Sequence, residues 1–265
     1  MNILIANDDG IYRRGIRVLA QALGRIEGAN IYVFAPDQER TAAGHGITIR
    51  DSLRLQEWNM DDYPTAKLAY ACSGTPADCV KIGISFLRQK GIRTDVVCSG
   101  INHGANLGTD VFYSGTVAAA MEARLMGVPG IAFSLCSHES DRFEAFHELV
   151  PAIVRKSFGK IPDHTILNVN VPDLPLAEIA GIVATDIGIR RFDEEYRLVQ
   201  RVEQGDYYEY VSMEKFYDGA GLETDIGANQ NGYVTISPIS MKRTALREIE
   251  DIKSWNIDWN IYENK

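Results

Sequence analysis

The chain has 265 residues, of which 45% are hydrophobic and 24% charged, and this composition is ordinary for a globular protein with a substantial core. Intrinsic disorder and collagen-like repeats are excluded. The 36 acidic and 27 basic residues give a formal net charge of −9 without a cluster of Lys and Arg, so neither extended nucleic acid nor an anionic membrane is an expected partner.

The first residues lack the basic start and the long apolar stretch of a secretory signal, and no segment reaches transmembrane length. We therefore expect a cytoplasmic protein. The cysteines are irregularly spaced among apolar residues and contain no Cys-x-x-Cys pair, so we expect buried thiols in a reducing compartment. They are Cys72, Cys79, Cys98 and Cys136.

Short runs rich in Ile and Val alternate with stretches of helical periodicity. The apolar runs predict strands at residues 3–6, 31–34, 96–98, 131–133 and 166–171. The periodic stretches predict helices at residues 15–23, 78–87, 116–126 and 143–157. Nearly continuous apolar strands are typical of a sheet that is covered on both faces. The pattern predicts a three-layer, Rossmann-like α/β fold with a parallel sheet, in which ligands bind at the carboxyl ends of the strands.

The pattern changes after residue 189. Charged and aromatic residues mix over residues 190–217, and Gly205 separates two roughly alternating segments, which predicts a projecting β-hairpin. Residues 233–239 predict one more strand. We accordingly divide the chain into a catalytic core, residues 1–189, and a segment 190–265 that holds the hairpin arm, a return strand and a C-terminal tail for oligomerisation.

The tail carries large apolar side chains in alternation with Asn and Asp: Trp255, Ile257, Trp259 and Ile261. This alternation predicts a strand with one apolar face. Each such side chain gains about 1.5–3 kcal/mol on full burial, so we expect the row to be covered by a second subunit, the alternative being its own core.

Two adjacent carboxylates, Asp8 and Asp9, directly follow the first predicted strand and precede Gly10. Such a pair repels unless solvent, a proton or a cation intervenes, and Gly10 lets the backbone turn both side chains toward one point. A hard divalent cation suits this arrangement. An Asp-Gly turn with solvated carboxylates accounts for the same residues equally well.

Residues 99–108 have the composition of a binding loop, with three glycines beside Asn102 and Asn106. Such a loop can present amide oxygens to a metal and backbone N–H groups to an anion. A tight structural loop, in which the asparagines satisfy their own backbone, is the alternative.

A third segment places Ser114, Gly115 and Thr116 at the start of an Ala-rich helix. The exposed N–H groups of a first helical turn, together with two hydroxyl groups, can cradle a phosphate. A plain helix cap uses the same residue types and is the commoner role of such a segment taken alone.

Several familiar motifs are absent: the P-loop, the dinucleotide-binding glycine pattern, the nucleophile elbow of esterases and the zincin helix. The five histidines show no metal-ligand spacing. Of these, only His103 lies in a candidate binding loop. We expect the others to be structural or at the surface, with His45 as the one exception to consider; they are His45, His138, His147 and His164.

Taken together, the motifs resemble those of the SurE family, stationary-phase survival proteins that act as metal-dependent nucleoside monophosphate phosphatases. The resemblance is carried by Asn-Asp-Asp-Gly at residues 7–10 and by segments 35–41, 74–80 and, most specifically, 99–120. Weaker matches at residues 168–172, 224–225 and 232–234 extend it over nearly the whole chain.

The resemblance implies one divalent cation per subunit, held by four residues: Asp8, Asp9, Thr41 and Asn102. It also implies a phosphate site made by four more: Asn106, Ser114, Gly115 and Thr116. Oxygen ligands without Cys or His favour Mg²⁺ or Mn²⁺ over zinc. Asp8 and Asp9 are the expected catalytic residues, and whether either one accepts a proton or attacks phosphorus stays open.

One ligand departs from the family pattern, which usually has Ser-Gly where this chain has Thr41-Ala42. Threonine keeps the ligand oxygen but adds a methyl group and stiffens χ1. Thr41 is therefore the least secure of the expected ligands.

The leading hypothesis is hydrolysis of nucleoside 5′- or 3′-monophosphates, with short polyphosphate as a further candidate substrate. The family resemblance also implies a homodimer or homotetramer that exchanges C-terminal elements. One alternative is an aspartyl-phosphate phosphatase of haloacid-dehalogenase type, although its acids are spaced Asp-x-Asp and not adjacent. The other is a non-enzymatic module that binds a metal and a nucleotide.

Overall fold

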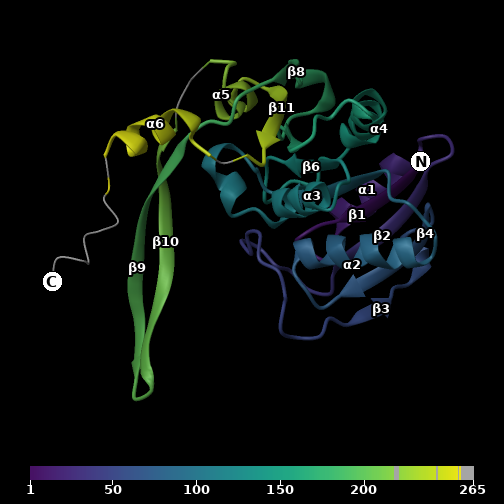
Figure 1. Cartoon of the computed structure of the whole chain (residues 1–265), viewed down its shortest axis with the longest axis horizontal. Coiled ribbons are helices and arrows are strands. Elements are labelled where there is room, and N and C mark those ends of the chain that lie inside the picture. Colours follow the sequence, from purple (N-terminus) through teal and green to yellow (C-terminus); the bar gives the residue numbers. More distant parts are fainter. Residues whose placement is uncertain (218–220, 243, 256, 258–265) are drawn as a thin grey trace.

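The structure is a computed structural model that describes residues 1–217, 221–242, 244–255 and 257, with the backbone alone for residues 212–217. Strands gather into one mixed sheet with helices on both faces (Figure 1). In spatial order the strands of this sheet are β3 (Leu55–Glu57), β4 (Ala66–Cys72), β2 (Asn30–Pro36), β1 (Asn2–Ala6), β5 (Val96–His103), β6 (Gly130–Leu135), β7 (Thr165–Val171), β11 (Tyr233–Ser240) and β8 (Gly181–Ala184).

The run from β4 to β7 is parallel throughout, which confirms the predicted parallel core. At one edge β3 pairs antiparallel with β4, and at the other β11 pairs antiparallel with β7 and parallel with β8. The sequence did not predict β3, β4 or β8. Strand β4 is rich in Ala and contains Lys67, β3 has two polar residues among its three, and β8 has only one Ile-Val pair between Gly181 and Ala184.

Helices α1 (Arg14–Gly24) and α4 (Phe146–Ser157) cover one face of the sheet, and α2 (Pro76–Gln89) and α3 (Gly115–Leu125) cover the other. Alternate residues of β1 show why: Ile3 and Ile5 pack in the α1 and α4 cluster, whereas Leu4 and Ala6 pack in the α2 and α3 cluster. All four helices were predicted. Helix α4 begins three residues later than expected. Phe143, the apolar residue at which the helix was expected to begin, is buried in the turn before it.

The predicted hairpin is present as β9 (Arg190–Val202) and β10 (Gly205–Tyr217), which pair antiparallel as a separate two-stranded sheet. Figure 1 shows it as a long arm that leaves the body of the protein. Most of its described side chains are exposed to solvent. The return strand β11 rejoins the main sheet after the short helix α5 (Asp225–Gln230).

The strand expected over the alternating residues of the tail lies almost wholly outside the described residues, which include only Trp255 and Ile257 of it. Helix α6 (Leu246–Ser254) precedes this segment, with Trp255 as its C-cap, and its apolar residues lie at helical spacing among charged ones. Trp255 and Ile257 are 65% and 75% exposed. Trp259 and Ile261 lie outside the described residues, and exchange of the tail between subunits stays a prediction.

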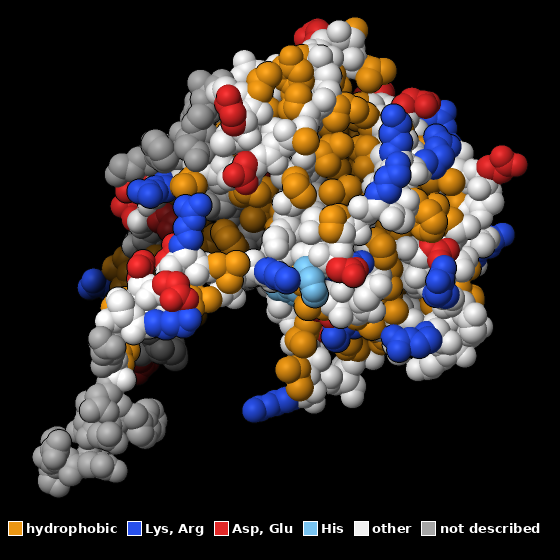
Figure 2. All heavy atoms as spheres, turned by 45° about the horizontal axis from the view of Figure 1, so that its top comes forward, with side chains coloured by type: hydrophobic (Ala, Val, Ile, Leu, Met, Phe, Trp, Pro, Cys, Tyr) orange, Lys and Arg blue, Asp and Glu red, His pale blue; other side chains and the backbone are white. Residues whose placement is uncertain are grey.

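Three thiols are buried as expected, Cys72, Cys79 and Cys98, whereas Cys136 is partly exposed. No helix within the described ranges has the length and apolarity that a membrane span needs. On the face seen in Figure 2, acidic and basic side chains are interspersed with hydrophobic ones.

Candidate active site

A cavity of about 330 Å³ lies at the carboxyl end of β1 and contains most of the predicted site. Six of the eight predicted residues line it: Asp8, Asp9, Thr41, Asn102, Asn106 and Ser114. They come from the loops after β1, β2 and β5, from Asn102 near the end of β5 and from the N-cap of α3. These residues thus meet at the carboxyl ends of the parallel strands, where ligands bind in folds of this class.

Asp8 is the most buried acid of this cavity, with 6% of its surface exposed. Thr116 donates its hydroxyl hydrogen to Asp8 Oδ1, and the backbone amides of Gly115 and Thr116 support the same carboxylate. A Cβ at Gly115 would lie 2.8 Å from Asp8 Cβ, so this glycine lets the start of α3 approach. The structure therefore places Gly115 and Thr116 behind Asp8, and their contact with phosphate stays a prediction.

Burial raises the pKa of Asp8 although these hydrogen bonds lower it. Burial, and after it the adjacent charge of Asp8, raise the pKa of Asp9 to about 6. Asp9 Oδ2 accepts a hydrogen bond from the backbone N–H of His103 at 3.2 Å. A positive charge between the two carboxylates would relieve both the desolvation and the repulsion.

The other two expected ligands contribute neutral oxygens. Asn102 Nδ2 donates to the carbonyl of Gly104 at 2.8 Å, which fixes the amide and leaves its Oδ1 as the atom to face a cation. Thr41 is exposed, and its hydroxyl donates to Glu39 Oε1 at 2.7 Å. Across the part of the chain that the structure describes, no three His, Cys, Asp or Glu side chains gather as a metal site. A cation here would therefore rely on amide and hydroxyl oxygens, a donor set that fits Mg²⁺ or Mn²⁺.

Two of the four residues expected to meet phosphate, Asn106 and Ser114, line the cavity and are held by hydrogen bonds to the residues behind them. The carbonyl of Asn106 accepts from Nδ2 of Asn168 and Asn170 at 2.8 and 3.0 Å, and its N–H donates to Asn170 Oδ1 at 2.9 Å. Ser114 caps α3 by accepting the Val117 N–H at 3.0 Å, which leaves the Ser114 hydroxyl hydrogen for another acceptor. Both side chains are buried and pre-oriented at the cavity wall.

Sequence reasoning missed several residues that line the same cavity. His138 follows β6, and a Cβ at Gly104, whose φ is +129°, would lie 2.3 Å from His138 Cε1. Gly104 is thus needed for the imidazole to pack on the loop. Arg13 and Glu39 line the cavity as well and form an ion pair at 2.7 Å. The position of His138 just past a strand's carboxyl end was the signal that could have found it.

His45 lies outside this cavity and has a structural partner. Its Nε2 is 2.9 Å from Oε2 of the buried Glu122, whose other oxygen pairs with Lys81 Nζ at 2.7 Å. Both contacts lower the pKa of Glu122, against the effect of burial. His45 therefore anchors the loop after β2 to α3.

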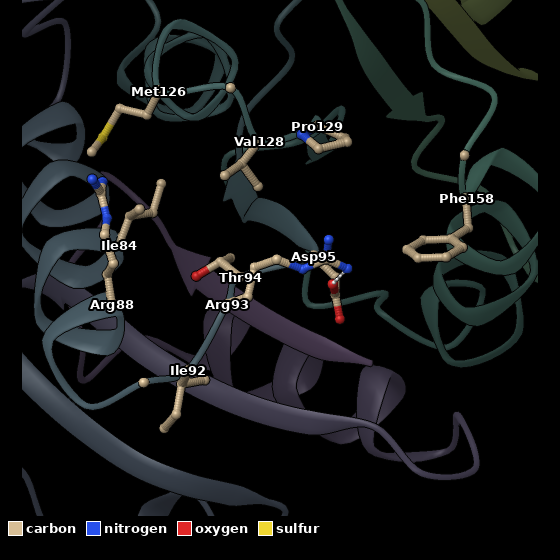
Figure 3. Close-up of a pocket in the computed structure, with 13 residues that line it drawn as sticks. Ile84, Arg88, Ile92, Arg93, Thr94, Asp95, Met126, Val128, Pro129 and Phe158 are labelled. Atoms are coloured by element: carbon tan, nitrogen blue, oxygen red, sulfur yellow. Dashed lines mark hydrogen bonds and ion pairs between the residues drawn. The ribbon is translucent and has the colours of Figure 1, made fainter.

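A second cavity, of about 590 Å³, opens near the amino ends of β5 and β6 (Figure 3). Its one acidic side chain, Asp95, already accepts hydrogen bonds from Arg93 at 2.8 Å and from the N–H of Asn2 at 2.9 Å. Ile84, Val128 and similar apolar side chains form much of its wall. The paired carboxylates, and with them the candidate chemistry, belong to the smaller cavity.

Comparison with known proteins gives a consistent result. Residues 3–194 match the family model described as survival protein SurE. The protein named 5′-nucleotidase SurE of Synechococcus sp. (strain JA-3-3Ab) is 42% identical over 259 residues, which cover 97% of this chain and 98% of the relative. The protein of the same name from Pelotomaculum thermopropionicum is 42% identical over 256 residues, or 96% and 94% of the two chains.

The fold matches as well. The crystal structure of the SurE protein from Aquifex aeolicus superimposes with a TM-score of 0.80 at 35% sequence identity, over 97% of this chain and 100% of that one. Because the family model covers most of the chain and the relatives align over nearly their full length, this chain belongs to the SurE family.

Proposed function

We propose that the chain is an enzyme that uses a divalent cation to hydrolyse nucleoside 5′- and 3′-monophosphates to nucleoside and phosphate. The relatives named above carry the name 5′-nucleotidase, which supports the nucleotide as substrate. The observation that carries the proposal is the convergence of Asp8, Asp9 and the Asn102 amide on one cavity beside Asn106 and Ser114.

The residues of the cavity divide into two roles. Asp8 and Asp9 would hold Mg²⁺ or Mn²⁺, with Asn102 and Thr41 as neutral oxygen donors. When bound, the cation supplies positive charge that neutralises the phosphate and favours attack by water.

Asn106 and Ser114 then position the substrate. Asn106 Nδ2 and the Ser114 hydroxyl donate to phosphate oxygens, and both groups are held by hydrogen bonds to the backbone or to buried side chains. Preorganised donors of this kind need no rearrangement as charge develops on the phosphate. In the absence of a cation, the two carboxylates repel the phosphate from the same cavity.

The first alternative, a haloacid-dehalogenase type of phosphatase, is not supported, because the chain belongs to another family and its acids are adjacent. The second, a binding module without turnover, differs from the proposal only in the chemical step. A measurement of phosphate release separates the two.

The test is release of phosphate from 5′- and 3′-mononucleotides and from short polyphosphate, each with Mg²⁺, Mn²⁺ or Zn²⁺ after treatment with EDTA. We expect turnover of mononucleotides that EDTA abolishes and Mn²⁺ or Mg²⁺ restores. Asp9→Asn should abolish it, while Asp206→Asn, at an exposed position near the hairpin turn, should not. Saturable binding without phosphate release would leave a binding module as the function.

A further inference from the structure

A third cavity, of about 880 Å³, lies where the arm leaves the body and is continuous with the candidate active site. The two cavities share three lining residues: Ala42, Asp110 and Tyr113. Tyr113 directly precedes Ser114, which is expected to bind phosphate. A ligand held at Ser114 therefore has a direct path past Tyr113 into the larger cavity.

Aromatic rings that are open to solvent gather around this larger cavity. Phe112 and Tyr113 come from the segment before α3 and are 60% and 68% exposed. Tyr196 of β9 and Tyr210 of β10 are 72% and 51% exposed, and their ring centroids lie 5.6 Å apart. Exposed rings grouped at one concave surface mark a ligand site more often than a plain surface, because each ring offers an apolar face at little entropic cost.

Hydrogen bonds hold the two walls of the cavity in register. Thr109 Oγ1 donates to the carbonyl of Arg190 at the start of β9, at 2.7 Å. The Asp225 carboxylate accepts from the N–H of Gly108 at 2.9 Å and from that of Gly188 at 2.8 Å, so it bridges the loop after β5 and the base of the arm. The walls are thus fixed before any ligand arrives, as in most small-molecule sites.

The charges at the cavity are balanced in a way that suits an uncharged ring. Arg190 Nη1 pairs with Asp110 Oδ2 at 2.5 Å, and the Arg190 guanidinium lies over the Phe192 ring, 5.2 Å from its centroid. Glu194 accepts a hydrogen bond from the Tyr210 hydroxyl at 2.7 Å. Arg191 also lines the cavity, so its two cationic and two anionic side chains offset one another. A flat heterocycle with polar edges finds ring faces and hydrogen-bonding groups here, without an excess of either charge.

We infer that this aromatic cavity binds the base of the nucleotide substrate, by stacking of the heterocycle on Phe112 and the neighbouring rings. The inference rests on the proposed function, and it adds the group by which the enzyme distinguishes a nucleotide from other phosphomonoesters. The phosphate lies against Asn106 and Ser114, the sugar passes Tyr113, and the base enters the cavity at the foot of the arm. Stacking does not depend on a particular base, so all common nucleotides gain from it.

The test compares adenosine 5′-monophosphate with ribose 5-phosphate, which has the same phosphate and sugar without the base. Phe112→Ala removes an exposed ring that lines only the aromatic cavity, and Tyr208→Ala removes a ring of β10 that is 57% exposed and lines neither cavity. We expect Phe112→Ala to raise KM for the nucleotide at least about fivefold with little change in kcat, since stacking contributes about 1–3 kcal/mol per base. KM for ribose 5-phosphate should not change, and Tyr208→Ala should behave as the parent.

Equilibrium dialysis of the two ligands with the same three proteins gives a readout that does not need turnover. The parent should bind the nucleotide more tightly than the sugar phosphate, and Phe112→Ala should reduce that preference. Equal affinity of the parent for both ligands, or equal losses for both in Phe112→Ala, would overturn the inference. Absence of hydrolysis together with an intact binding preference would contradict the proposed function and leave the aromatic site in place.

Discussion

The adjacent carboxylates of the candidate metal site should lower the stability of the metal-free protein at neutral pH. Replacing Asp9 with Asn keeps the shape of the side chain and the acceptor for the His103 N–H, and removes the charge. In the folded chain the pKa of Asp9 is about 6 against an ordinary 3.8, raised by burial and then by Asp8. Ionisation of Asp9 is therefore easier in the unfolded chain than in the folded one.

The sign and the size follow from this difference. Because the folded pKa is raised, the parent loses stability as pH rises from about 4 to about 6 and stays lower above that range. A difference of about 2 pKa units corresponds to about 3 kcal/mol, and solvent around the partly exposed side chain reduces the effect to about 1–2 kcal/mol. The free energy of unfolding of Asp9→Asn should therefore exceed that of the parent by about 1–2 kcal/mol at pH 8 and equal it near pH 4.

The assay is unfolding by urea in EDTA at several values of pH, for the parent, Asp9→Asn and the surface control Asp206→Asn. Addition of Mn²⁺ at pH 8 should make the parent more stable than Asp9→Asn, because a ligand of the folded state stabilises only the protein that binds it. An Asp9→Asn protein that is less stable than the parent at pH 8 in EDTA, or equally stabilised by Mn²⁺, would refute the reasoning.

Three more changes test the remaining parts of the site and the tail. Thr41→Ser should keep Mn²⁺ affinity, while Thr41→Val should weaken it by about 1–3 kcal/mol through loss of the hydroxyl; unchanged affinity in a Mn²⁺ titration would show that Thr41 only binds Glu39. Thr116→Val removes the hydroxyl that lowers the pKa of Asp8, so the pH midpoint of Mn²⁺ binding should move upward, and an unmoved midpoint would contradict that role. If the tail joins subunits, truncation after Arg247 should reduce the number of subunits per particle measured by light scattering. A monomeric full-length chain would contradict an oligomer. An unchanged number of subunits after truncation would leave the hairpin as the element that joins them.

The core of the fold could be predicted because its strands are buried on both faces and therefore read as runs of Ile and Val. Ile3 and Leu4 contact opposite helix layers, so neither can be polar. Strand β4 was not predicted because three of its seven residues are Ala, which has no strand preference of its own, and Lys67 interrupts the apolar run. The strand expected in the tail stays a prediction, because only Trp255 and Ile257 of that segment are among the described residues.

The candidate site shows the same division. Asp8 and Asp9 could be predicted because two adjacent acids after a buried strand repel each other unless they share a cation, a proton or solvent. His138 was missed although it closely follows a predicted strand, because the strand pattern does not describe the turn after β6 that brings the imidazole against Gly104. The sequence also could not tell that Thr116 donates to Asp8, since a helix cap, a phosphate donor and a carboxylate donor require the same hydroxyl.

The central claim is that Asp8 and Asp9 together hold a divalent cation. The most direct test is a titration of the metal-free chain with Mn²⁺ in which electron paramagnetic resonance measures the concentration of unbound ion at each step. We predict one Mn²⁺ per chain for the parent and for Asp206→Asn, with affinity reduced at least about tenfold in Asp9→Asn, because loss of a charged contact costs about 1.5–3 kcal/mol. Parental affinity and stoichiometry in Asp9→Asn would contradict the claim.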